Sequence, residues 1–118
     1  MIKQRTLVPG KIIEFIIEGN CTLGEVLDIV QNHYGSISES VLWNLAAGSN
    51  SLLTSADMVR IAQTVKKNAV HTRAAYVCPD DLEFGLFRMY QSHAEIEGVS
   101  TGMKVFRTRE EALLWLHD

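Results

Sequence analysis

Short runs of apolar residues alternate along the chain with longer runs whose apolar positions recur at helical spacing. The clearest strand is Ser40 to Ala46, where Val41, Trp43 and Leu45 would point to one side and Leu42 to the other. A strand that is apolar on nearly both faces is typical of the centre of a parallel sheet. This stretch therefore predicts the central strand of the domain.

Four helices are predicted by one recurring start signal, a capping residue followed three positions later by an acidic residue. The pairs are Thr22 with Glu25, Thr54 with Asp57, Asp80 with Glu83, and Thr108 with Glu111. The first side chain of such a pair accepts a hydrogen bond from a free backbone N–H of the first helical turn, so the pattern marks a helix start. We expect the first helix to end at Gly35 and the third near Ile96.

Predicted strands lie directly ahead of these helices. The resulting strand–helix units start near Lys11, Ser40, Arg73 and Met103, and a further strand, Ile2 to Val8, precedes them. Alternating strands and helices imply parallel strands joined by right-handed crossovers. The expected fold class is therefore α/β: one domain over residues 1–118, an initial strand followed by four βα units, and a mainly parallel or mixed sheet with helices packed on it.

The connection between the first two strands contains Pro9 and Gly10, which suit a tight turn. A type II turn at Pro-Gly twists against the usual hairpin, however. The sequence therefore leaves open whether these two strands pair as a hairpin.

The composition argues against several function classes. The chain has a formal net charge of −3, whereas nucleic-acid binding needs concentrated Lys and Arg. Glu14 and Glu18 interrupt the longest apolar run, so neither a signal peptide nor a membrane span is expected. Cys21 and Cys78 are too few for a disulfide framework, and we expect them to be small, partly buried side chains. A cytoplasmic protein is expected.

No constellation of residues in the sequence indicates an enzyme. The histidines at positions 33, 71, 93 and 117 lack the spacing of a zinc site. The sequence also lacks the fingerprints for dinucleotides, nucleoside triphosphates and serine hydrolysis. We therefore expect a non-enzymatic protein without a metal or a cofactor.

Three stretches of packing residues carry a family resemblance. They are Val41 to Leu45, Phe84 to Tyr90, and Lys104 to Arg107 with Glu110 to Leu116. Together they resemble small bacterial STAS-like proteins, whose fold is that of the anti-sigma-factor antagonists and is shared with lipid-binding CRAL-TRIO domains. The resemblance implies a bacterial, cytoplasmic domain that regulates by binding a protein.

The resemblance also implies a modification site. The antagonists carry an Asp-Ser pair at the start of the helix after the central strand, and this Ser accepts a phosphate. The stretch here is Leu52-Leu53-Thr54-Ser55, which has the hydroxyls and lacks the acid. Thr54 and Ser55 are thus candidate phospho-acceptors, because a phosphate there would meet free N–H groups and the positive end of the helix dipole. The simpler interpretation is that Thr54 only caps the helix.

A polar loop follows the central strand, at the edge where open parallel sheets usually bind ligands. It contains Ser49, Asn50 and Ser51 after Gly48, and Asn44 lies near the same edge. Related proteins often have Asp where Asn44 stands. Asn44, Ser49, Asn50 and Ser51 are therefore a candidate rim for a ligand or partner, with a plain surface connection as the alternative.

The predicted helix from Asp80 to Ile96 is apolar on more than one side. One stripe consists of Leu82, Leu86, Met89, Tyr90 and His93, and Phe84 and Phe87 project away from it. Phe84 and Phe87 are candidates for a partner surface, for a contact between two copies, or for the lining of a pocket. Coverage by a neighbouring element is the plain alternative.

Two functions follow from these candidates. The leading one is a non-enzymatic regulatory or protein-interaction module of STAS type, with a switch at the start of the second helix and a protein partner or a second copy as its target. The alternative is a carrier of a small apolar ligand or lipid, whose pocket would lie near Phe84 and Phe87 and include Trp43.

Overall fold

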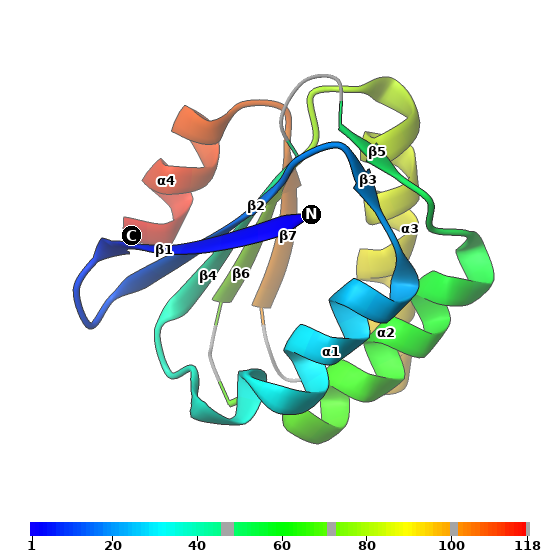
Figure 1. Cartoon of the computed structure of the whole chain (residues 1–118), viewed down its shortest axis with the longest axis horizontal. Helices are drawn as coiled ribbons and strands as arrows, with labels where there is room; N and C mark the ends of the chain where they lie inside the picture. The colour runs from blue at the N-terminus through cyan, green and yellow to red at the C-terminus, as the bar shows by residue number, and fades with distance from the viewer. Residues whose placement is uncertain (46–48, 71–72, 100–101, 118) are drawn as a thin grey trace.

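A mixed β-sheet runs through the centre of the molecule (Figure 1). The computed structural model describes residues 1–45, 49–70, 73–99 and 102–117, and within these ranges the central sheet has the strand order β1-β2-β4-β6-β7. The strands are β1 (Ile2–Val8), β2 (Ile12–Ile17), β4 (Ser40–Leu45), β6 (Arg73–Val77) and β7 (Gly102–Phe106). β1 runs antiparallel to β2, and the other neighbours are parallel. The predicted α/β fold with an initial strand and a mixed sheet is confirmed.

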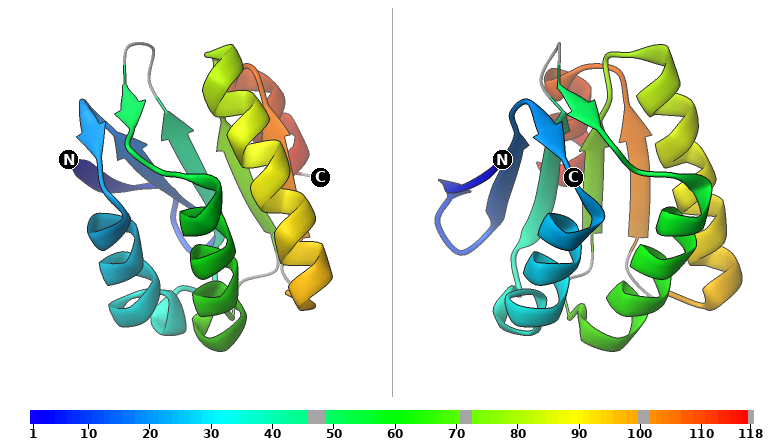
Figure 2. Two further views of the ribbon diagram at one scale, coloured as in Figure 1. Left: turned by 90° about the vertical axis from the view of Figure 1, so that its right-hand side faces the viewer. Right: turned by 45° about the vertical axis from the view of Figure 1, so that its right-hand side comes forward.

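Helices cover the two faces of this sheet unequally. The helices α1 (Leu23–Asn32), α2 (Ser55–Asn68) and α3 (Asp81–Glu97) lie on one face, and α4 (Arg109–His117) lies on the other (Figures 1 and 2). The first three connect parallel strands that are laid down in one direction across the sheet, so right-handed crossovers place all of them on the same side. No strand follows α4 in the described chain, and it covers the opposite face.

The alternation of side chains along the strands divides the core into two layers. On β4, Val41, Trp43 and Leu45 belong to the layer under α1, α2 and α3, whereas Leu42 belongs to the layer under α4. Leu42 lies there with residues such as Phe106 of β7. A strand buried on both faces needs apolar residues at nearly every position, which is the pattern that made β4 recognisable in the sequence.

The predicted helix starts carry their caps. Thr54 and Asp57 form a complete capping box, in which Asp57 N donates to Thr54 Oγ1 at 3.2 Å and Thr54 N donates to Asp57 Oδ2 at 2.9 Å. Thr22, Asp80 and Thr108 each accept a hydrogen bond from a backbone N–H of the first turn that follows. Local hydrogen bonding thus sets where each helix begins.

The end of the first helix differs from the prediction. α1 ends at Asn32 and not at Gly35, and the short 3₁₀ helix η1 (Tyr34–Ser36) follows it. The cause is a tertiary contact, since Trp43 Nε1 donates a hydrogen bond to the Tyr34 hydroxyl at 2.7 Å inside the core. The tighter turn brings the tyrosine ring inward. α3 ends at Glu97, close to the predicted position.

The first two strands form the hairpin that the sequence left open. Lys11 N donates to Val8 O at 2.9 Å across the turn, and Gly10 adopts a positive φ of 72°. The register of the two strands shifts between Thr6 and Val8. Such a bulge adds local twist, which lets a turn of unfavourable hand join the two strands.

A short parallel pair of strands lies outside the central sheet and was not predicted. It consists of β3 (Asn20–Cys21) and β5 (Asn50–Ser51). Two-residue strands have no periodicity that a sequence pattern can reveal. The pair ties the segment after β2 to the segment before α2.

A buried carboxylate lies on the α4 side of the central sheet. Glu14 of β2 has an exposed fraction of 0%. It accepts hydrogen bonds from Arg5 Nε at 2.8 Å, from Arg109 Nε and Nη2 at 2.9 and 3.3 Å, and from Asn44 Nδ2 at 3.3 Å. We call these four residues the Glu14 cluster. It joins β1, β2, β4 and the start of α4 through one charge, whose burial requires such partners.

The two arginines control the protonation of this carboxylate. Burial by itself would raise the pKa of Glu14, but the hydrogen bonds and positive charges of Arg109 and Arg5 outweigh it and hold the pKa below its ordinary value of 4.5. In acid the folded state therefore binds fewer protons than the unfolded state. The stabilisation from Glu14 is complete above pH 4.5 and is lost as the pH falls through the lowered folded pKa.

We expect Glu14→Gln to lower the free energy of unfolding at neutral pH by about 2 kcal/mol, since two charge-assisted contacts are lost while Arg5 and Arg109 can turn toward water. Urea unfolding at a series of pH values measures this. The difference between wild type and variant should shrink below pH 4.5, because protonated Glu14 resembles Gln. Glu18→Gln, which removes an exposed ion pair with Lys3, is the matched control and should change little. A difference that stays constant throughout the acid range would contradict the assignment.

Candidate functional site

The start of α2 presents two hydroxyl side chains at the carboxyl edge of the parallel strands. Thr54 and Ser55 are both exposed. The Thr54 hydroxyl is held in the capping box with Asp57, whereas Ser55 is the first residue of the helix and lies outside that box. The two candidates therefore differ in their hydrogen bonds, as the capping role predicted for Thr54 implies.

An anion at this position would meet both attraction and repulsion. Backbone N–H groups of the first turn and the positive end of the helix dipole favour a phosphate. The carboxylate of Asp57 already occupies part of this field, since its Oδ2 accepts from Thr54 N at 2.9 Å. A phosphate on Thr54 would have to open the capping box beside that carboxylate, and a phosphate on Ser55 leaves the box intact.

The predicted rim after β4 is tied down by backbone pairing. The backbone of Asn50 and Ser51 forms β5, paired with β3, and Leu52 N donates to Cys21 O at 2.8 Å. Ser49 is half-buried, and Gly48 lies outside the described residues. This segment leads directly into the first turn of α2.

Asn44 lies apart from the other rim candidates. Its side chain is half-buried and donates to Glu14 on the α4 side of the sheet, whereas its neighbours Trp43 and Leu45 face the other helices. Successive side chains of a strand point to opposite faces of the sheet, so Asn44 lies on the other face from Trp43 and Leu45. The structure thus places Asn44 in the Glu14 cluster, away from Thr54 and Ser55.

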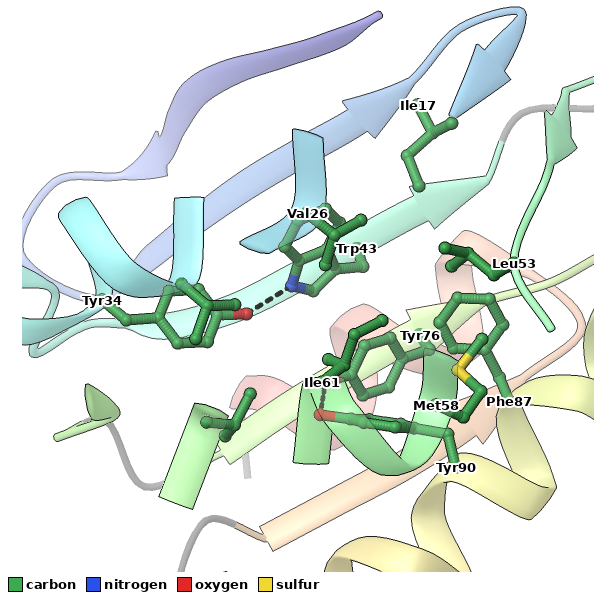
Figure 3. Close-up of a pocket in the computed structure, with 12 residues that line it drawn as sticks. Ile17, Val26, Tyr34, Trp43, Leu53, Met58, Ile61, Tyr76, Phe87 and Tyr90 are labelled. Carbon is green, nitrogen blue, oxygen red and sulfur yellow. Dashed lines mark hydrogen bonds between the residues drawn. The ribbon is translucent and has the colours of Figure 1, made fainter. Parts of the chain in front are cut away.

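A small apolar cavity lies between α1, α2, α3 and the sheet (Figure 3). Its lining is Ile17, Val26, Val30, Tyr34, Trp43, Leu53, Met58, Ile61, Val65, Tyr76, Phe87 and Tyr90. Phe87 and Trp43, two residues of the carrier hypothesis, are therefore brought together here. The cavity measures about 20 Å³, roughly the space of one water molecule.

Tyrosine hydroxyls and an indole N–H point toward this cavity (Figure 3). Trp43 Nε1 donates to Tyr34 at 2.7 Å, and Tyr76 donates to the Tyr90 hydroxyl at 3.5 Å. Burial raises the pKa of Tyr34 and of Tyr76 well above the ordinary value, and raises that of Tyr90 to about 12. These hydroxyls are neutral at physiological pH and act as hydrogen-bonding core residues.

Phe84 lies outside the cavity, at the margin of α3. It is half-buried, and the Arg107 guanidinium lies 4.0 Å from the centre of its ring. Arg107 Nη1 also donates to Asp81 Oδ1 at 2.5 Å. These contacts join the end of β7 to the start of α3. No local pattern in the sequence indicated these contacts, because Arg107 is far along the chain from both partners. By contrast, the charge of Glu14 inside an apolar run is a visible sign in the sequence that a charged side chain is buried.

The two cysteines are more deeply buried than the sequence suggested, since Cys21 and Cys78 both have an exposed fraction of 0%. Burial, with a contribution from Glu25, raises the pKa of the Cys21 thiol to about 11. Burial, with a contribution from Glu83, raises that of Cys78 to about 12. Both thiols are protonated at neutral pH, so neither is a ready nucleophile.

The described residues offer little for other kinds of site. Among them, no group of three or more His, Cys, Asp and Glu side chains could hold a metal ion. Within the same ranges, no helix has the length and apolar character that crossing a membrane requires.

The comparison with solved structures identifies a protein of the same architecture. A structure of the Bacillus cell fate determinant SpoIIAA in the phosphorylated form aligns with a TM-score of 0.53 at 13% sequence identity, over 98% of this chain and 99% of that chain. The chain has the fold of SpoIIAA. The predicted STAS-like fold is confirmed. No protein-family model matches the sequence, and no curated protein matches it significantly.

We expect both thiols of the native protein to react with a thiol reagent such as DTNB only very slowly at pH 8, because burial excludes the reagent and raises both pKa values. Absorbance of the released thiolate measures the rate. Unfolding in guanidinium chloride should expose Cys21 and Cys78 together and make both react at once. Rapid labelling of either cysteine in the native protein would show that its segment opens.

Proposed function

We propose that this protein is a non-enzymatic regulatory module that binds a partner protein at the carboxyl edge of its sheet, and that phosphorylation of Ser55 controls this binding. The observation that supports it is an exposed serine hydroxyl at the first position of α2, in a chain with the fold of SpoIIAA, a protein whose structure is known in a phosphorylated form. The fold would serve as the scaffold for partner binding, and the Ser55 hydroxyl is the group that a kinase would phosphorylate.

Ser55 is preferred to Thr54 because of their different hydrogen bonds. Thr54 Oγ1 is the acceptor of the cap and lies next to the Asp57 carboxylate. Its phosphorylation would remove a cap worth about 1 kcal/mol and would bring two anions together. Ser55 has an exposed side chain outside the box, so a phosphate on it keeps the helix start intact while it changes the surface charge.

The charge around Ser55 indicates the kind of partner. Asp57 is in the same helical turn, and Asp80 is exposed at the start of α3, which packs beside α2. The side chain of Leu52, just ahead of the helix, is 51% exposed. An exposed apolar residue, with acidic side chains at the starts of α2 and α3, suits a partner that presents an apolar contact together with basic residues. A phosphate on Ser55 adds negative charge to this edge and alters that match.

The switch predicts different outcomes for two neighbouring substitutions. Incubation of the protein with ATP and an extract of its source cells should add one phosphoryl group to wild type and to Thr54→Ala, and none to Ser55→Ala. Phosphopeptide mapping by mass spectrometry measures this. Thr54→Ala should lower the free energy of unfolding by about 1 kcal/mol through loss of the cap. Phosphate on Thr54 in the wild-type protein would contradict the assignment.

Partner binding should respond to the charge at Ser55. Ser55→Asp should change the amount of partner recovered on immobilised protein relative to Ser55→Asn, which has nearly the same size without the charge. Both variants should unfold at nearly the same urea concentration, since the side chain is exposed. Identical recovery with Ser55→Asp and Ser55→Asn would argue against a charge switch.

The carrier hypothesis makes an opposite prediction for the purified protein. With a cavity of about 20 Å³, we expect native mass spectrometry to give the mass of the chain without any bound apolar molecule, because this space is far below that of a ligand pocket. A lipid or apolar metabolite that stays bound and is released by denaturation would instead support a carrier, with Phe87 and Trp43 in its pocket.

A further inference from the structure

α3 lies on the outside of the helical layer (Figure 2), and it carries exposed apolar side chains. Leu82 and Ile96 are each 79% exposed, and Met89, which is half-buried, lies midway between them in the helix. Gly85 and Ser92, both exposed, occupy the intervening positions. We call these five residues the outer stripe. Its members are separated alternately by three and four residues, which is the spacing of a coiled-coil seam.

The outer stripe takes no part in the core of this chain. The buried residues of α3 are Glu83, Phe87, Tyr90 and Ala94, which lie on the opposite side of the helix at 100° per residue. Leu82 and Ile96 thus leave two large apolar side chains exposed on a face of α3 that does not belong to the core.

Gly85 is a second observation that favours a close contact on the outer side of α3. Glycine is the poorest helix former after proline, and Gly85 has no positive φ to explain its use. A Cβ at this position would meet nothing within 4 Å. Its small size therefore serves no packing within the chain, and it leaves a depression between Leu82 and Met89 on the outer surface.

We propose that the outer stripe binds a second copy of this chain, with the two α3 helices antiparallel. In this arrangement Gly85 lies opposite Ile96 of the second copy, and Met89 lies opposite Ser92. Met89 and Ile96 then each face a small residue, so the two helices can approach closely.

The charges beside the outer stripe select this orientation. Arg88 and Glu95 are exposed and lie one heptad apart on the same flank of the outer stripe. In an antiparallel pair this flank faces itself, so Arg88 lies opposite Glu95 of the second copy, twice by symmetry. In a parallel pair Arg88 would instead lie opposite His93, and Glu95 would have no basic partner. Self-complementary charge favours a second copy over an unrelated protein as the occupant.

Sedimentation equilibrium of the full chain tests the proposal. We expect a reversible monomer–dimer equilibrium, and Leu82→Glu should raise the dimer dissociation constant by at least about tenfold. Leu114→Glu is the matched control, because Leu114 of α4 is also largely exposed, at 74%, and it should leave the constant unchanged. Gly85→Leu should fold, since the space for its side chain is open, and should also weaken the dimer.

A charge-reversal cycle tests the orientation. Arg88→Glu and Glu95→Arg should each raise the dissociation constant by about tenfold, and the double variant should restore it, because the opposed charges are simply exchanged. Circular dichroism should be the same for all three. Ser55 lies on α2, so Ser55→Ala should leave dimerisation intact, and the two proposals can fail separately.

Three results would overturn the inference. One is a chain that stays monomeric up to about 1 mM. Another is a dimer that is unaffected by both Leu82→Glu and Gly85→Leu, which would place the contact elsewhere. The third is a double variant that dimerises as weakly as either single reversal, which would exclude the antiparallel arrangement.

Discussion

The arrangement of the sheet and of α4 depends on one buried charge. Glu14 is enclosed on the α4 side of the sheet, and its carboxylate has to be satisfied by donors from Arg5, Arg109 and Asn44. These donors come from the initial strand, from the central strand and from the last helix. Displacing either arginine would remove part of the compensation for this buried charge. The cluster thus couples the N-terminal hairpin to the C-terminal helix.

The other face of the sheet is held together by a different kind of contact. Aromatic rings from β4, β6, α3 and η1 pack together there, and their polar atoms hydrogen-bond to one another, as in Trp43 with Tyr34. Such a core is close-packed and leaves space for about one water molecule. This packing holds α3 and η1 against the sheet.

The two proposed interaction surfaces lie on neighbouring helices. The start of α2 offers Ser55 beside carboxylates at the edge of the sheet, and the outer stripe offers apolar side chains along α3. The start of α2 is suited to a change of charge, and the outer stripe is suited to permanent apolar packing. Since the two helices pack side by side, a modification on α2 and a dimer through α3 would be close in space without sharing a residue.

Much of this structure follows from local features of the sequence. The capping pairs at Thr54 and Thr108 and the doubly apolar strand around Trp43 act within a few residues, so the helix starts, the order of elements and the fold class were all predictable. The charge of Glu14 inside an apolar run was also a local sign of a buried ion, although its partners were not identifiable.

The tertiary structure was needed wherever the local sequence pattern allowed two equally good placements of a side chain. α3 has apolar residues on more than one side, and only packing decided that Phe87 is buried and Leu82 exposed. Likewise the sequence grouped Asn44 with the loop residues 49–51, and strand alternation placed its side chain with Glu14 instead. The sequence by itself determined the elements, because hydrogen bonds and periodicity act between near neighbours. Their pairings were decided by contacts between residues far apart in the chain, whose energies depend on geometry that no local pattern contains.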